Sequence, residues 1–168
     1  MDKVSKDIDK GIDKNNLNNY SIGINLFKYL LSNLKKGSTI LEFGSGYGSY
    51  ELSKCFNVFS IEQNRDWVNK FPGVNYLYSP IDRATNFYES SFLSLVPDQY
   101  DCIIVDGPAG YRRDGFFQIL NDLNTNVIIA VDDVHRAPEA MFALELASRL
   151  KRKIVYIPEF DKVSVVLL

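Results

Sequence analysis

Three aspartates stand where a ligand could meet them. Asp106 follows the apolar run that ends at Val105, and Asp132 and Asp133 follow the run that ends at Val131. If both runs are neighbouring parallel strands, their carboxyl ends share the rim of a sheet where ligands bind in open α/β folds. Carboxylates crowded there repel unless a cation, a proton or an amine lies between them. A divalent cation such as Mg²⁺, which takes oxygen ligands, is one candidate. The alternative is that Asp132 or Asp133 caps the next helix.

A second pattern is glycine-rich and reads Glu42-Phe-Gly44-Ser-Gly46-Tyr-Gly48. Glycines at such a turn let the backbone bend tightly and let a ligand approach it. Glu62 stands at the end of the next apolar run, where an acid can accept hydrogen bonds from ribose hydroxyls. The spacing is GxGxG rather than the GxGxxG of dinucleotide sites, and no Walker A lysine follows. The pattern predicts a nucleotide site of another kind.

The elements that would position these residues alternate along the chain. Continuous apolar runs predict strands at 39–43, 57–61, 74–78, 100–105, 127–131, 153–157 and 163–168. Helical patterns occupy 20–34, 49–55, 65–70, 86–95, 115–123 and 138–150. Apolar strands alternating with helices favour a parallel sheet covered on both faces. The segment 158–162 is too short for a parallel crossover, so the last two strands should form an antiparallel hairpin. We expect an α/β, Rossmann-like, mostly parallel seven-stranded sheet with an antiparallel last strand.

Length and composition limit the remaining possibilities. The 168 residues suit one domain at 20–168, preceded by a polar arm at 1–19 that is either flexible or a lid over a ligand. The net charge of −2 disfavours a broad basic surface for nucleic acid. Cys55 and Cys102 lack the spacing of a zinc site or a disulfide framework. Without a signal peptide or a long apolar run, we expect a cytoplasmic protein that does not enter membranes.

The glycine pattern resembles the first motif of class I S-adenosylmethionine (SAM)-dependent methyltransferases, E/DxGxGxG. Glu62 matches the acid after the second strand of that family, and the resemblance covers about residues 38–168. It implies that Glu42 anchors the loop or lies near the SAM amino group, that Glu62 holds the ribose, and that the loop 79–82 cradles the adenine. The cofactor-binding residues that it implies are Glu42, Gly44, Ser45, Gly46, Gly48, Glu62, Gln63, Ile81, Asp82 and Asp106.

The aspartate pattern resembles that of cation-dependent O-methyltransferases. Catechol-type enzymes carry Asp…Asp-Asn at these strand ends and macrocin-type enzymes carry Asp…Asp-Asp, which implies metal ligation by Asp106, Asp132 and Asp133. In those families the metal binds two substrate hydroxyls and lowers the pKa of the one that is methylated. The catechol-type lysine three residues after the first aspartate is replaced here by Ala109. The stretch 106–111 also resembles the AspxProxGlyTyr segment of glucuronoxylan O-methyltransferases, which points to a sugar substrate.

Several side chains near these aspartates are candidates for contact with an acceptor. His135 is the only histidine, and a neutral imidazole there could take a hydroxyl proton, or it could simply orient the loop. The predicted catalytic residues are therefore Asp106, Asp133 and His135. Arg112 or Arg113 could pair with a substrate carboxylate, with surface solvation as the alternative.

Together these patterns predict a SAM-dependent methyltransferase that methylates an oxygen of a small-molecule or saccharide acceptor, with help from a divalent cation. One alternative is a nicotinamide-dependent oxidoreductase, which the glycine spacing disfavours. Another is a non-catalytic SAM-binding module. Nucleic-acid methylation is disfavoured by the charge and by the lack of an Asn/Asp-Pro-Pro-aromatic motif after the fourth strand. The oligomeric state is open, with a homodimer among the options.

Overall fold

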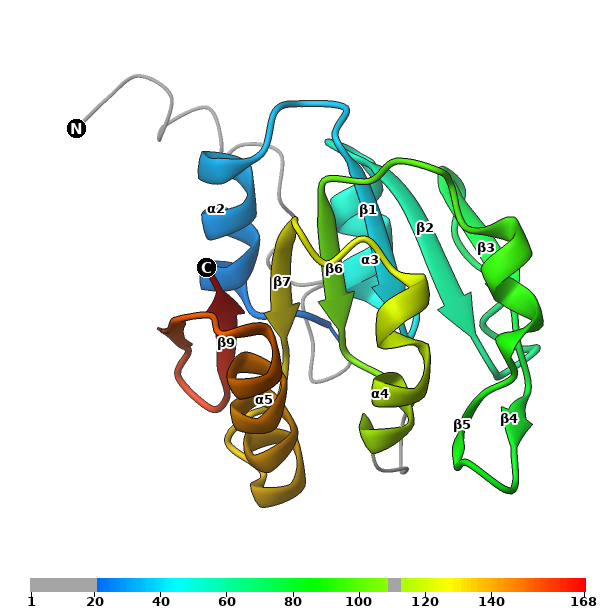
Figure 1. Cartoon of the computed structure of the whole chain (residues 1–168). Coiled ribbons are helices and arrows are strands. Elements are labelled where there is room, and N and C mark those ends of the chain that lie inside the picture. The colour runs from blue at the N-terminus through cyan, green and yellow to red at the C-terminus, as the bar shows by residue number, and fades with distance from the viewer. Residues whose placement is uncertain (1–20, 109–112) are drawn as a thin grey trace.

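A seven-stranded sheet forms the centre of the computed structural model, which describes residues 21–108 and 113–168 (Figure 1). Its strand order is β3-β2-β1-β6-β7-β9-β8. Strands β3, β2, β1, β6 and β7 pair in parallel, whereas β9 is antiparallel to both of its neighbours. The predicted sheet with an antiparallel last strand is thus confirmed. The strands are β1 (Thr39–Phe43), β2 (Asn57–Glu62), β3 (Val74–Tyr78), β6 (Cys102–Val105), β7 (Ile128–Val131), β8 (Ile154–Pro158) and β9 (Val163–Leu167).

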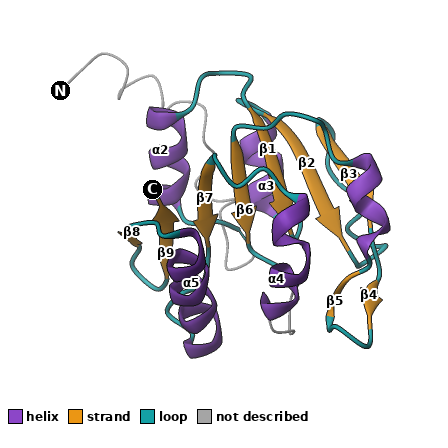
Figure 2. Ribbon diagram, viewed as in Figure 1, coloured by secondary structure: helices purple, strands orange, loops and turns teal. Residues whose placement is uncertain are grey.

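Helices cover both faces of the sheet and enclose two apolar cores (Figure 2). On one face pack α2 (Ile24–Asn33) and α3 (Tyr47–Ser53), and on the other α4 (Phe116–Ile119) and α5 (Ala137–Leu150). Successive residues of a strand point to opposite faces, so Ile104 joins the core under α2 and α3, and Val105 joins the core under α4 and α5. This double burial explains why the central strands are apolar without interruption.

Two predicted helices are wrong. The segment 65–70 forms turns, because the Asn64 side chain accepts the Asp66 backbone N–H and Asn69 adopts a positive φ of 60°. An Asx turn of this kind competes with helix formation. The segment 86–95 begins with a strand, β5 (Phe87–Tyr88), that pairs with β4 (Ile81–Asp82), and only Ser90–Leu95 is helical, as a 3₁₀ helix. The predicted helix at 115–123 is α-helical only in α4, with 3₁₀ turns on both sides.

The register of the sheet brings the acidic strand ends together. Val105 of β6 lies between Phe43 of β1 and Val131 of β7 in one row of the sheet. Asp106 and Asp132 each follow this row by one residue, so both lie at the carboxyl rim. The antiparallel strand β9 begins at the same rim and therefore delivers the residue before it, Lys162, to the aspartates.

The predicted arm at 1–19 lies outside the described residues, as does the segment 109–112. Within the described ranges, none of the helices has the length and apolar character needed to cross a bilayer.

Candidate cofactor and acceptor site

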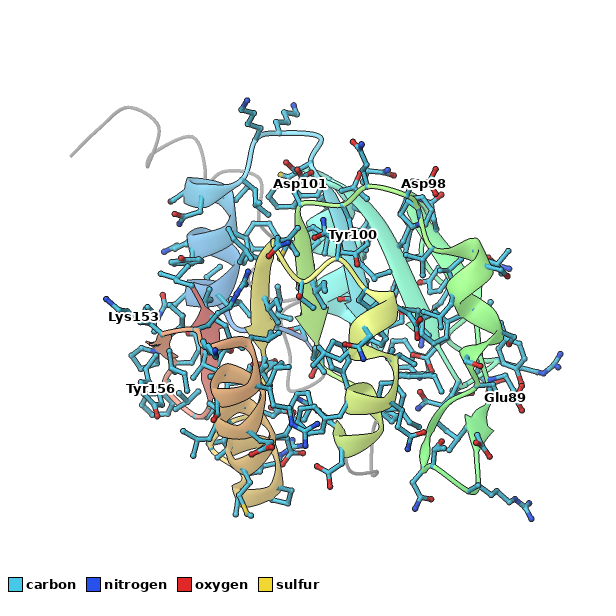
Figure 3. All side chains as sticks on the ribbon, viewed as in Figure 1. Glu89, Asp98, Tyr100, Asp101, Lys153 and Tyr156 are labelled. Atoms are coloured by element: carbon cyan, nitrogen blue, oxygen red, sulfur yellow. The ribbon has the colours of Figure 1, made fainter. Side chains whose placement is uncertain are left out.

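A cavity of about 320 Å³ opens at the carboxyl rim of the sheet. A larger hollow of about 620 Å³ lies at the opposite edge, around Tyr100 and Asp101, where β6 begins (Figure 3). Ligands of open parallel sheets bind at the carboxyl ends of the strands, and only the rim cavity adjoins the glycine loop, so we assign the site to it. Its lining residues are Ser21, Gly44, Ser45, Glu62, Gln63, Asn64, Trp67, Asp106, Gly107, Pro108, Arg113, Asp133, Arg136, Glu139 and Lys162.

Glu42 anchors the glycine loop through hydrogen bonds relayed by Ser49. The Ser49 hydroxyl donates to Glu42 Oε2 at 2.5 Å, and the Gly46 N–H donates to Ser49 Oγ at 2.9 Å. The Glu42 side chain is buried, and burial raises its pKa from 4.5 to about 8. Of the two roles that the sequence suggested for Glu42, the structure therefore shows the anchoring one.

The glycines of the loop serve close contacts within the protein. A Cβ on Gly44 would lie 2.8 Å from the Gly107 nitrogen, and a Cβ on Gly48 would lie 2.9 Å from the Ile22 nitrogen. Gly44 also lines the cavity, whereas Gly46 and Gly48 do not. Packing between segments of the chain thus accounts for a glycine at position 48, and its predicted contact with the cofactor stays a prediction.

Glu62 ends β2 and faces the cavity. Its Oε2 accepts the Ser45 backbone N–H at 2.9 Å, and its Oε1 accepts the Asn64 backbone N–H at 2.6 Å. Burial is the main cause that raises its pKa, although these hydrogen bonds oppose the shift. Each carboxylate oxygen can accept more than one hydrogen bond, so the side chain keeps capacity for the hydroxyls of a ribose.

Two further cavity residues follow Glu62. The buried Oε1 of Gln63 has no hydrogen-bond partner among the described residues, which fits a donor group of a ligand. Trp67 was not identified from the sequence, although it is the only tryptophan and follows a strand-end acid closely. The Lys70 ammonium lies 3.6 Å from the centroid of the Trp67 ring. An aromatic ring at this place suits contact with a flat, apolar ligand surface.

The structure does not bring Ile81 and Asp82 to this cavity. Asp82 accepts hydrogen bonds from the Ala84 backbone N–H and the Thr85 hydroxyl, which closes the turn between β4 and β5. Ile81 is partly buried and packs against the core. Their assignment to the adenine stays a prediction.

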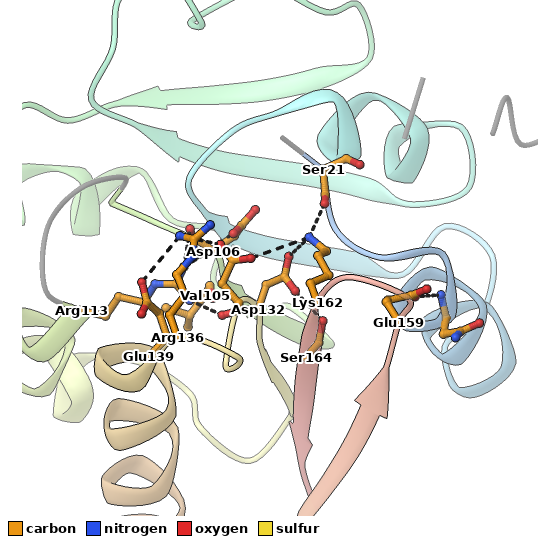
Figure 4. A network of polar contacts seen from close by, with 12 residues as sticks. Ser21, Val105, Asp106, Arg113, Asp132, Arg136, Glu139, Glu159, Lys162 and Ser164 are labelled. Atoms are coloured by element: carbon orange, nitrogen blue, oxygen red, sulfur yellow. Dashed lines mark hydrogen bonds and ion pairs between the residues drawn. The ribbon is translucent and has the colours of Figure 1, made fainter. Parts of the chain in front are cut away.

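Asp132 and Asp133 lie around a lysine, and Asp106 pairs with Arg113 beside them; Figure 4 shows Asp132 with Lys162 and Asp106 near Arg113. The Lys162 ammonium lies 2.6 Å from Asp132 Oδ2 and 4.0 Å from Asp133 Oδ1. The Ser164 hydroxyl donates to the other Asp132 oxygen, and the Asp132 side chain is fully buried. Of the three partners that such an acidic cluster requires, the structure supplies the amine. Lys162 was not identified from the sequence.

Arg113 links the ends of β6 and β7 from inside the protein. Its guanidinium donates to the carbonyl oxygens of Val105 at 2.9 Å, Asp132 at 2.6 Å and Asp106 at 2.7 Å. The residue is only 4% exposed. The Arg113 donors are thus used mainly on main-chain oxygens, and not on solvent, the alternative that the sequence left open beside a substrate carboxylate. Tyr111 and Arg112 lie outside the described residues.

Asp106 combines access to the cavity with a raised pKa. Burial first, and the charge of Asp132 second, raise its pKa from 3.8 to about 7, while Arg113 and Lys162 oppose the rise. A carboxylate with a pKa near neutrality is well suited to accept a proton from a substrate. Asp133 also lines the cavity and forms an ion pair with Arg136 at 3.1 Å.

The acidic rim does not fit a divalent cation as it stands. Both oxygens of Asp132 are already engaged, by Lys162 and by Ser164. The Lys162 ammonium occupies the space between Asp132 and Asp133 that an ion would need. Across the described ranges, no group of three or more histidine, cysteine, aspartate or glutamate side chains is arranged to hold a metal ion. The predicted ligands Asp106, Asp132 and Asp133 lie at the same rim, but Asp132 and Asp133 surround the Lys162 amine and Asp106 pairs with Arg113.

His135 is exposed in the loop between β7 and α5 and is absent from the cavity lining given above. His135 therefore lies outside the site, although it is only two residues from Asp133 in the sequence. Among the three predicted catalytic residues, the geometry places Asp106 and Asp133 at the cavity.

Comparison with solved structures decides the fold. A precorrin-6y C5,15-methyltransferase from Geobacter metallireducens matches 94% of this chain over 95% of its own, with a TM-score of 0.62 and 14% identity. A methyltransferase from Geobacter sulfurreducens matches 99% over 88%, with a TM-score of 0.59 and 16% identity. The O-methyltransferase TomG from Streptomyces achromogenes, solved with SAM, matches 100% over 90%, with a TM-score of 0.58 and 18% identity. This is the class I methyltransferase fold.

No protein-family model matches the sequence, and no curated protein matches it significantly. At 14–18% identity, a likeness to solved structures establishes the methyltransferase fold alone. Because one fold supports many chemistries, the reaction has to be argued from the residues of the cavity.

Proposed function

We propose that the protein is a SAM-dependent methyltransferase that methylates an oxygen atom of a small hydroxylated or sugar-like acceptor. The observation that carries this proposal is the arrangement of Glu62 and Asp106 on one cavity. Glu62 lies at the end of β2 beside the glycine loop, and Asp106 lies at the end of β6. One acid can hold the ribose, and the other can receive a proton from the acceptor.

The residues present fit SAM on the side of the cavity formed by β1 and β2. Glu62 would hold the ribose hydroxyls, and the Gly44–Ser45 backbone would border the methionine portion. The unpaired Gln63 Oε1 offers an acceptor, and Trp67 offers an aromatic surface. These are the groups that a nucleoside ligand requires: an acid for the hydroxyls, polar contacts for its edge, and an apolar face.

The other side of the cavity would receive the acceptor. When bound, SAM supplies a sulfonium methyl group, and its transfer forms a C–O bond as the C–S bond breaks and the electron pair passes to sulfur. Asp106 takes the proton of the acceptor hydroxyl, so that the oxygen carries the charge needed for attack. The residues that line the cavity would position that oxygen for attack, and such positioning supplies much of the rate enhancement. Because the whole cavity measures about 320 Å³ and would also hold the cofactor, we expect a small acceptor.

Isothermal titration calorimetry tests the cofactor assignment. We expect binding heat from SAM and from S-adenosylhomocysteine, its demethylated product, and none from NAD. Absence of heat from both adenosyl compounds at millimolar concentration would overturn the proposal, and heat from NAD alone would favour the oxidoreductase.

Transfer is measured next, with methyl-labelled SAM and a panel of phenols, hydroxy acids and monosaccharides. We expect label in at least one hydroxylated acceptor. Tight binding without transfer to any member of the panel would favour the non-catalytic module.

A further inference from the structure

The Lys162 side chain is unusual for a lysine in a strand-connecting segment, because only 13% of it is exposed. Its ammonium donates to the Ser21 carbonyl oxygen and to Asp132 Oδ2. It also lines the cavity beside Asp106 and Asp133. A buried charge of this kind is retained only when partners compensate for the loss of water, and here the aspartates at the strand ends do so.

We propose that the Lys162 ammonium takes the place of a divalent cation in this site and donates an N–H to the acceptor oxygen. The hydrogen bond to the acceptor rests on the proposed function. The replacement of the cation by Lys162 rests on the charges of the rim alone. Lys162 is then a substrate-binding residue of a methyl transfer that requires no metal ion.

The charges of the rim support this exchange, by which we mean the Lys162 ammonium in place of a divalent cation. Lys162 approaches Asp132 and Asp133 from one side, at 2.6 and 4.0 Å. The Arg113 guanidinium approaches Asp106 and Asp133 from the other, at 3.6 and 3.9 Å. Two fixed side chains thus supply the two positive charges that a divalent ion would bring. An additional ion would have to enter against both of them, which costs energy at these distances.

The donors of Lys162 support its role toward the acceptor. An ammonium carries three N–H groups, and the Ser21 carbonyl and Asp132 occupy two of them. Among the described residues, none accepts the third within hydrogen-bond distance, since Asp133 is 4.0 Å away. The third N–H is therefore available to an oxygen in the cavity. Such a donor stabilises the negative charge that develops when Asp106 removes the hydroxyl proton.

This arrangement has a consequence for the substrate class. A chelated metal ion favours acceptors with two adjacent hydroxyls, because both oxygens can bind it. Lys162 has one N–H left for the acceptor, so an acceptor with a single hydroxyl is sufficient. We expect phenols or sugars with an isolated free hydroxyl to be methylated as well as their vicinal diols.

Calorimetric titration with Mn²⁺, without cofactor or acceptor, tests the exchange. The wild-type protein should bind Mn²⁺ no better than millimolar. Lys162→Ala, which leaves the carboxylates without their ammonium, should bind one Mn²⁺ at least tenfold more tightly. Lys153→Ala is the matched control, because it removes an exposed lysine directly before β8 and should behave as the wild type. Adding Asp132→Asn to Lys162→Ala should abolish the gained site.

Several outcomes would overturn the exchange. Tight Mn²⁺ binding by the wild type, or equal binding by wild type and Lys162→Ala, would do so, as would loss of wild-type methyl transfer in EDTA. Circular dichroism establishes that the variants are folded. Should Lys162→Ala fail to fold, the wild-type titration and the EDTA assay decide the question. These results are distinct from a failure of SAM binding, which would overturn the proposed function and leave the exchange intact.

Discussion

Gly44 and Gly107 lie against each other across the strand ends of β1 and β6. A Cβ on Gly44 would lie 2.9 Å from Gly107 Cα, and a Cβ on Gly107 would lie 2.8 Å from Gly44 Cα and 2.5 Å from the Tyr88 hydroxyl. Both glycines also line the cavity. The loop that would bind SAM and the loop that carries Asp106 are thus held at a distance that no larger residue permits.

Gly44→Ala should therefore destabilise the protein and distort the cavity together. The positive φ of 94° and the clash with Gly107 act in the same direction, and we expect a loss of about 2–4 kcal/mol in the free energy of unfolding. Gly37→Ala is the control, since Gly37 has a φ of 84° but nothing within 4 Å of its Cβ position. It should cost only about 1–2 kcal/mol. Chemical denaturation measures both, and equal losses would show that the close approach contributes nothing.

Glu62 and Asp82 allow the two cofactor assignments to be separated. Glu62→Gln removes the charge that would hold the ribose and should weaken S-adenosylhomocysteine binding by about 10- to 100-fold. Asp82→Ala alters a turn away from the cavity lining and should change the affinity by less than about twofold, an amount worth well under 1 kcal/mol. Calorimetry measures both variants. A large loss in Asp82→Ala would instead support the adenine contact predicted from the sequence.

Glu42 should make the stability of the apo protein depend on pH. Its pKa is 4.5 in the unfolded chain and about 8 in the folded protein, so the folded state retains a proton that the unfolded state releases. Stability should therefore be highest below pH 4.5 as far as Glu42 is concerned, and should fall as the pH rises toward 8. In Glu42→Gln this fall should be smaller, because the amide does not titrate while it can still accept the Ser49 hydroxyl.

Melting temperatures between pH 5 and 8 check this prediction. Glu145→Gln, at an exposed position of α5, provides the control and should keep the wild-type slope. If Glu42→Gln loses stability with pH as steeply as the wild type, Glu42 is ionised in the folded protein and the prediction is wrong.

Asp106 should set the pH dependence of methyl transfer. The base must be deprotonated to act, so kcat/KM should rise with pH through an apparent pKa of about 7 and then level off. Asp106→Asn should lower kcat by at least about 100-fold, the range for removal of a general base. His135→Ala should keep wild-type kcat, because His135 is exposed and away from the cavity lining. If His135→Ala lowered kcat strongly and Asp106→Asn did not, His135 would be the base instead.

The sequence predicts the fold well because its strongest signals are physical requirements of the fold. Strands buried on both faces must be apolar throughout, and a five-residue connection such as 158–162 must form a hairpin. The same holds for Glu42 and Glu62, whose places beside the glycine loop follow from the strands that precede them. The helix at 65–70 is mispredicted because Asn64 and Asn69 form local turn geometry that the apolar spacing does not reveal.

Lys162 and Arg113 were harder to anticipate, since isolated basic residues usually belong to the surface. Both are drawn inward by non-local structure: the reversal of β9 partly buries Lys162, and carbonyl oxygens at two strand ends hold Arg113 in the interior. For Lys162 a signal did exist. The predicted antiparallel hairpin places the residue before the last strand at the rim where Asp132 ends β7, and this implication could have been drawn from the sequence.

Trp67 gives the protein an optical reporter of its own. It is the only tryptophan in the chain, and it lines the same cavity as Glu62 and Asp106. Indole emission responds to the polarity and the charges around the ring, and the ring already lies against the Lys70 ammonium. Any compound that enters should change the fluorescence of the unlabelled protein. Candidate acceptors can thus be screened by a plate reader before the identity of the substrate is known.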